Sequence, residues 1–130
     1  VIDDGLRGTT DYSIELLEKL LPALQGPYEF FGFSGGSKGL SKGFVVSSCW
    51  TDGTETGAAS KGASVVIRDS NGLEIRCTGL TIGYGGEGPG GTEKAMRLLG
   101  FDQAIIDLVD RADTLHAVSN FPDPISFSPR

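Results

Sequence analysis

The first candidate for chemistry is a serine in a glycine-rich stretch. Residues 32–36 read Gly-Phe-Ser-Gly-Gly and match the G-x-S-x-G spacing of a nucleophile elbow, with Ser34 as the nucleophile. His116, the single histidine, follows after several aspartates, so a serine, an acid and a base occur in a workable order. A nucleophile elbow must lead directly into a helix, whereas residues 37–43 contain only serine, lysine, glycine and leucine. We therefore expect a hairpin loop here and no catalytic residue.

His116 lies on the apolar side of a helix that we expect to run from Asp102 to His116 or Val118. A histidine in such a place is usually a half-buried core residue with hydrogen-bonded ring nitrogens. Its functional alternative is a base for Ser34 or Cys49, which requires a contact in space. With one histidine and no paired cysteines, we expect no metal site.

A second glycine pattern, G-x-G-x-x-G, lies in the loop 83–91 just before a predicted helix. Backbone N–H groups at the start of that helix, near Thr92, are suited to bind a phosphate or a carboxylate. Glu87 and Pro89 oppose this interpretation, because one adds a negative charge and the other lacks an N–H donor. We expect a sharp structural turn and no dinucleotide cofactor. The glycines of the pattern are Gly83, Gly85 and Gly88.

Small anions define an alternative function for the two glycine-rich loops, 34–43 and 83–91. The first loop carries two lysines among glycines and serines, which is a composition that can hold an anion through ammonium groups and backbone donors. Neither lysine has the spacing of a Walker A phosphate loop. This alternative is a small protein, or a minor enzyme, that binds a phosphate or carboxylate ligand. Its residues are Ser34, Lys38, Lys42, Gly88 and Thr92.

Four other residues predict a surface for a protein partner. Tyr84 is flanked by glycines and followed by Glu87, and an exposed aromatic ring beside a carboxylate is typical of recognition surfaces. Asp107 and Asp110 point away from the apolar side of the predicted C-terminal helix. An acidic surface of this kind steers a basic partner, as in small inhibitor or immunity-type proteins that cover a cationic cleft. For Tyr84 alone core packing is the favoured interpretation, and for the two aspartates a solvated helix face is the structural alternative.

Composition restricts the class of protein further. The chain has 130 residues and a formal net charge of -6, which fits one soluble domain and opposes nucleic-acid binding. It holds no apolar run of membrane-spanning length, and its acidic start is unlike a signal peptide, which slightly favours the cytoplasm. Two buried thiols at Cys49 and Cys77 are favoured over a disulfide between paired strands, but both stay open.

The elements that must position these residues follow from hydrophobic periodicity and from turn residues. An amphipathic helix is predicted from Asp11 to Leu21, before Pro22, and Asn71-Gly72 predicts a hairpin turn at residues 69–72. Seventeen of the 20 glycines fall between residues 26 and 91, where β structure and loops are expected. The predicted strands are 28–31, 43–50, 63–68, 73–78 and 80–82. Helices are predicted at 92–99, stopped by Gly100, and from Asp102 onward, and the tail from Phe121 is expected to be extended and irregular.

The order of helix, strands and helices predicts an α+β domain. We expect an antiparallel sheet of about four or five strands, with an N-terminal helix and two C-terminal helices packed on one face. The favoured function is a non-enzymatic binding module for a basic protein, without a cofactor, a nucleic-acid partner or a membrane partner. The alternatives are the small-anion binder and a structural subunit of a larger assembly.

Overall fold

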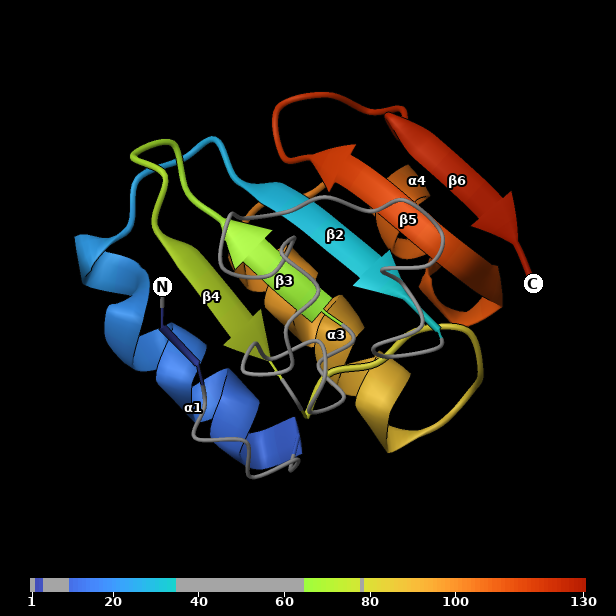
Figure 1. Cartoon of the computed structure of the whole chain (residues 1–130), viewed down its shortest axis with the longest axis horizontal. Coiled ribbons are helices and arrows are strands. Elements are labelled where there is room, and N and C mark those ends of the chain that lie inside the picture. The colour runs from blue at the N-terminus through green and yellow to red at the C-terminus, as the bar shows by residue number, and fades with distance from the viewer. Residues whose placement is uncertain (1, 4–9, 35–64, 78) are drawn as a thin grey trace, which may run out of the picture.

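The computed structural model of the protein describes residues 2–3, 10–34, 65–77 and 79–130 (Figure 1). In these ranges the chain forms strands, α-helices and two short 3-10 helices. In chain order they are β1 (Ile2–Asp3), α1 (Thr10–Leu20), η1 (Leu21–Ala23), β2 (Glu29–Phe33), β3 (Val65–Arg68), β4 (Glu74–Cys77), α3 (Glu87–Leu98), α4 (Gln103–Ile106), η4 (Val109–Arg111), β5 (Ala112–Val118) and β6 (Ser126–Pro129). None of the described helices is both long and apolar enough to cross a membrane.

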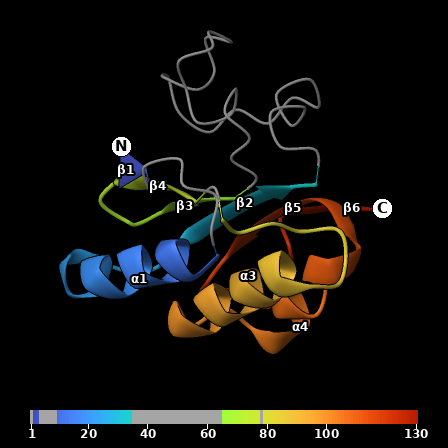
Figure 2. The same cartoon turned by 90° about the horizontal axis from the view of Figure 1, so that it is seen from below.

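The described strands form one sheet in the order β1-β4-β3-β2-β5-β6. All neighbours pair antiparallel except β1, which pairs parallel with β4. Helices α1, α3 and α4 lie together on one face of this sheet (Figure 2). The structure thus confirms the predicted α+β class, with its antiparallel sheet and with an N-terminal helix and two C-terminal helices.

The predicted hairpin is confirmed, because β3 and β4 pair antiparallel on either side of residues 69–72. The turn is held by the Asp69 carboxylate, whose Oδ1 accepts hydrogen bonds from the backbone N–H groups of Asn71 and Leu73 at 3.0 and 2.9 Å. Gly72 has a φ angle of 86°, a conformation that favours glycine. Side-chain and backbone chemistry at the turn therefore agree.

The core lies between the sheet and its helices. Leu17 of α1 and Met96 of α3 are buried against it, and the Phe30 and Phe101 rings meet edge to face with centroids 6.1 Å apart. The end of α3 is shaped by Gly100, whose φ is 82°: the N–H groups of Gly100 and Phe101 bond to the carbonyls of Arg97 and Met96. This confirms the predicted stop at Gly100, after which Phe101 is buried in the core.

The long C-terminal helix of the prediction is wrong. Asp102 caps a helix as expected, through a 2.9 Å bond from the Ala104 N–H, but α4 ends at Ile106. After η4 the chain becomes β5, whose residues 114–118 pair with the whole of β2. Apolar residues in this region satisfy a helical period, but Leu115 and Ala117 also alternate as a strand requires, and the long-range pairing with β2 decides the outcome.

Three further local predictions differ from the structure. Helix α3 begins at Glu87, five residues before Thr92, because a carboxylate suits the first turn and a proline there needs no N–H acceptor. Residues 80–82 form no strand. The tail from Phe121 is irregular only as far as residue 125, since residues 126–129 pair with β5 as β6. The predicted strand at 43–50 lies outside the described residues.

Candidate functional site

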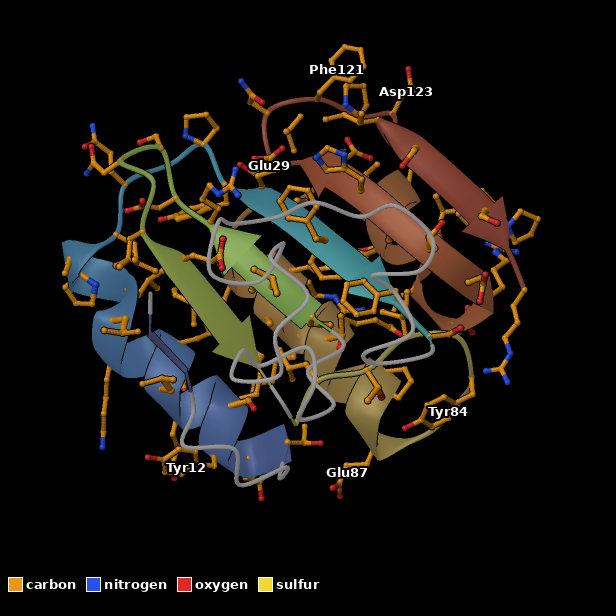
Figure 3. All side chains as sticks on the ribbon, viewed as in Figure 1. Tyr12, Glu29, Tyr84, Glu87, Phe121 and Asp123 are labelled. Atoms are coloured by element: carbon orange, nitrogen blue, oxygen red, sulfur yellow. The ribbon has the colours of Figure 1, made fainter. Side chains whose placement is uncertain are left out.

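Tyr84 and Glu87 lie where the loop after residue 82 enters α3. Tyr84 is 47% exposed, so the favoured interpretation of core packing does not hold for it. Its hydroxyl accepts a 2.9 Å hydrogen bond from Thr81 Oγ1. Glu87 is exposed in the first turn of α3. The two side chains lie at the same end of the molecule (Figure 3).

Asp107 and Asp110 are also exposed, at the end of α4 and within η4. The Asp107 carboxylate accepts a 2.8 Å bond from Gln103 Nε2, one helical turn earlier. Neither aspartate is on the long helix that the sequence predicted, yet both remain on the protein surface. Their exposure follows from the short, tight turns of α4 and η4, whose Ile105 and Val109 are buried instead.

Backbone contacts bring these two acidic segments together. The Gly83 N–H donates to the Val109 carbonyl at 2.9 Å, so the residues next to them in sequence, Tyr84 and Asp110, belong to adjoining segments. Arg130 Nη1 donates to the Gly83 carbonyl at 2.9 Å, so both backbone polar groups of Gly83 are bonded. Helix α3 also contacts both α4 and η4. We call the set Tyr84, Glu87, Asp107 and Asp110 the partner surface.

The described residues of the small-anion alternative, Ser34, Gly88 and Thr92, already make contacts within the protein. The Ser34 hydroxyl donates to Asp113 Oδ1 at 2.6 Å, and the buried Thr92 hydroxyl donates to the Thr81 carbonyl at 2.7 Å. Gly88 packs so closely on Thr81 that a Cβ atom there would clash with its hydroxyl. Lys38 and Lys42 lie outside the described residues.

A serine–histidine pair is not formed either. His116 is opposite Phe31 in the β2–β5 register, three residues before Ser34, which places it roughly 10 Å along the strand. Its Nε2 instead lies 2.6 Å from Glu29 Oε2. Cys77 is buried in β4, and Cys49 lies outside the described residues, so their pairing stays a prediction. Within the described ranges, no group of three or more His, Cys, Asp or Glu side chains is placed to hold a metal ion.

A cluster of charged residues that sequence reasoning missed lies on the sheet face opposite the helices. Arg68 Nη1 is 3.5 Å from Glu29 Oε1, and Arg68 Nη2 is 3.4 Å from Glu74 Oε1. The His116 ring stacks on Phe31 at 4.3 Å between centroids, and the Arg68 guanidinium lies 5.5 Å from the centre of the same ring. We call Glu29, Arg68, Glu74 and His116 the ion cluster.

Strand register alone explains why these side chains meet. Glu29 pairs with Arg68, Arg68 pairs with Glu74, and His116 pairs with Phe31, so alternation puts all of them on one face. Arg68 and Glu74 flank the predicted hairpin turn, so their contact was accessible from the sequence. The contact of Glu29 with His116 was not, because it depends on β5 being a strand.

Comparison of the chain with known protein families, with curated proteins and with solved structures finds no match. The function must therefore be argued from the geometry of the two regions, the partner surface and the ion cluster.

Proposed function

We propose that this protein is a non-enzymatic binding module that recognises a basic protein through the partner surface, in the manner of an inhibitor or immunity protein. The observation that carries the proposal is the bond between Gly83 and Val109, which joins two segments that each expose carboxylates. An exposed tyrosine among them supplies a large contact at low entropic cost. Carboxylates of this kind accelerate the encounter with a cationic partner.

The state of the reactive groups supports a binding role over a catalytic one. Ser34 is bonded to Asp113, His116 to Glu29, and Thr92 to a backbone carbonyl. A nucleophile needs a base within hydrogen-bond reach, and Ser34 has an aspartate there but no histidine. These bonds also weaken the small-anion alternative, because the two hydroxyls that it needs already have acceptors within the protein.

The test compares three forms of the immobilised protein in capture from cells of the source organism. The first is the wild type, and the second is the triple variant E87Q/D107N/D110N. The third is a matched control on the exposed side of α1, D11N/E15Q/E18Q, which removes the same number of charges. We expect a basic protein to bind the wild type and the control, to be lost by the surface variant, and to dissociate as salt rises.

Two results would contradict the proposal. One is a captured protein that the surface variant retains as well as the wild type does. The other is a partner with an acidic or neutral surface whose binding is insensitive to salt. Y84A in the wild-type background separates the aromatic contribution, which we expect to lengthen the lifetime of the complex rather than to speed its formation.

A further inference from the structure

A pocket of about 360 Å³ opens at the end of the sheet where β2 begins and β3 ends. Its size falls within the range of small-molecule sites, about 300–1,000 Å³. Pro27, Tyr28 and Val118 contribute apolar walls, and the partly exposed charges at its rim are Glu29 and Arg68. The remaining lining residues are Asp69, Ser70 and Gly72.

A neighbouring side chain fixes the orientation of each of the two rim charges. His116 Nε2 lies 2.6 Å from Glu29 Oε2, and the 2% exposed Glu74 carboxylate lies 3.4 Å from Arg68. Phe31 lies between the His116 ring and the guanidinium, and contacts both. These contacts hold the Glu29 carboxylate and the Arg68 guanidinium side by side in a fixed geometry before a ligand binds.

The contact between the two rim charges themselves is weak. Glu29 Oε1 and Arg68 Nη1 are 3.5 Å apart, whereas a strong charge-assisted hydrogen bond measures about 2.7–2.9 Å. Both side chains are 29% exposed, so each still faces solvent at the pocket. Asp69 differs, because it is 5% exposed and its carboxylate accepts backbone bonds from Gln25, Asn71 and Leu73. The charges open to a ligand are therefore one carboxylate and one guanidinium.

We propose that this pocket binds a free α-amino acid with an apolar side chain. The ammonium group of such a ligand bonds to Glu29, its carboxylate takes the unused N–H donors of Arg68, and its side chain lies against Pro27, Tyr28 and Val118. Ammonium and carboxylate on one carbon are adjacent charges of opposite sign, as Glu29 and Arg68 are. A ligand with one charge satisfies only one rim group and is repelled by the other.

The experiment is an NMR titration of the whole protein with three matched probes. L-Phenylalanine carries both charges, 3-phenylpropionate only the carboxylate, and 2-phenylethylamine only the ammonium, and an L-leucine series repeats the design with an aliphatic side chain. We expect the amino acid of at least one series to bind about tenfold or more tightly than either of its analogues, with shifts at Glu29, Arg68 and Val118. The proposal is overturned if an analogue binds as tightly, or if neither amino acid binds at about 10 mM.

Two variants distinguish ligand contacts from structural support. E29Q keeps the side-chain shape and should abolish the preference for the amino acid over 3-phenylpropionate. R68K keeps the charge but removes the planar fork of donors, and should reduce the preference over 2-phenylethylamine without abolishing it. A purely structural role would weaken all three probes equally, which would contradict the proposal. D123N, an exposed change outside the pocket lining, is the control that should leave all three affinities unchanged.

This inference does not rest on the proposed binding of a protein partner. Glu29 lies toward the end of the molecule that carries Phe121 and Asp123, away from Tyr84 and Glu87 (Figure 3). Variants of the pocket should therefore leave capture of the basic protein unchanged, and variants of the partner surface should leave the amino-acid titration unchanged. If R68K fails to fold by circular dichroism, the change in preference of E29Q decides the question.

Discussion

At the pocket end of the sheet, charged side chains are bonded to one another. At the partner surface, a backbone hydrogen bond joins the two segments that carry the charges. Glu29 has His116 and Arg68 as side-chain partners. The segments that carry Tyr84 and Asp110 are joined instead by the peptide N–H of Gly83 and the carbonyl of Val109. The first arrangement fixes the positions of charges through contacts between strands. The second fixes the backbone, and its Tyr84 and Asp107 side chains bond to residues three or four positions earlier in the chain.

The two arrangements suit different kinds of ligand. Fixed charges around a small cavity favour a ligand whose groups match them in spacing, because binding then costs little conformational entropy. Exposed carboxylates on a defined backbone favour a large partner, whose approach they accelerate and whose surface they adapt to. The two proposals thus follow from the different ways in which the protein positions its charged side chains at the two ends.

The largest expected effect is on the backbone junction of the partner surface. Gly83 has a φ of 93°, and a Cβ atom there would lie 2.7 Å from Ser34 Cβ and 2.9 Å from the Ala112 carbonyl oxygen. Gly83→Ala should therefore lower the free energy of unfolding by about 3 kcal/mol in urea denaturation. Gly85→Ala is the matched control, because no atom lies within 4 Å of its Cβ position, and it should change stability by less than about 0.5 kcal/mol. Equal effects of the two changes would show that the junction does not depend on the glycine.

A second prediction concerns the interlocked charges. Arg68→Ala removes the guanidinium from the 2% exposed Glu74 and from Glu29, and should cost about 2 kcal/mol, since Arg68 itself keeps some contact with water. Arg97→Ala breaks an exposed pair with Glu93 at 3.5 Å and should cost less than about 0.5 kcal/mol. Thermal unfolding of both variants measures the difference. If both changes cost the same, the ion cluster is no more than an ordinary surface network.

Local chemistry made several features predictable from the sequence. Asn71-Gly72 between apolar runs predicted the β3–β4 hairpin, Pro22 predicted the end of α1, and Gly100 predicted the end of α3. Asp102 was correctly expected to cap the next helix. Each of these signals acts over a few residues, so the rest of the fold does not have to be known.

Features that depend on distant partners were not predictable in the same way. The pattern of residues 112–118 fits both a helix and a strand. They form a strand because their backbone groups can pair with β2. The ion cluster depends on that outcome, since His116 on a helix would not face Glu29. The early start of α3 depends on Gly88 and Gly91, which let its first turns approach Thr81 and Thr10. All three results depend on contacts between different elements of the fold.

A smaller effect on stability is expected at Thr92, and its variant also tests the small-anion alternative. Thr92→Val removes the buried hydroxyl that donates to the Thr81 carbonyl and should cost about 1 kcal/mol of stability. It should not change the response of the protein to inorganic phosphate in a thermal-shift assay. A phosphate-induced shift that is present in the wild type and absent in the variant would restore Thr92 as a ligand-binding residue.

The smallest effect on stability, and the sharpest test of the comparison, is expected at the two aspartates of the partner surface. Asp110 is exposed in η4, the Asp107 carboxylate accepts from Gln103, and the bond from Arg111 Nη2 goes to the Asp107 backbone carbonyl, so D107N/D110N should change the free energy of unfolding by less than about 0.5 kcal/mol. The same change should slow association with the captured basic protein, since two steering charges are lost, while the dissociation rate changes less. Stopped-flow measurements at two salt concentrations separate the effects. If the variant instead dissociates faster, and does so at high salt as well, the aspartates act by direct contact. The contrast between an adaptable acidic end and a fixed pocket end is then wrong.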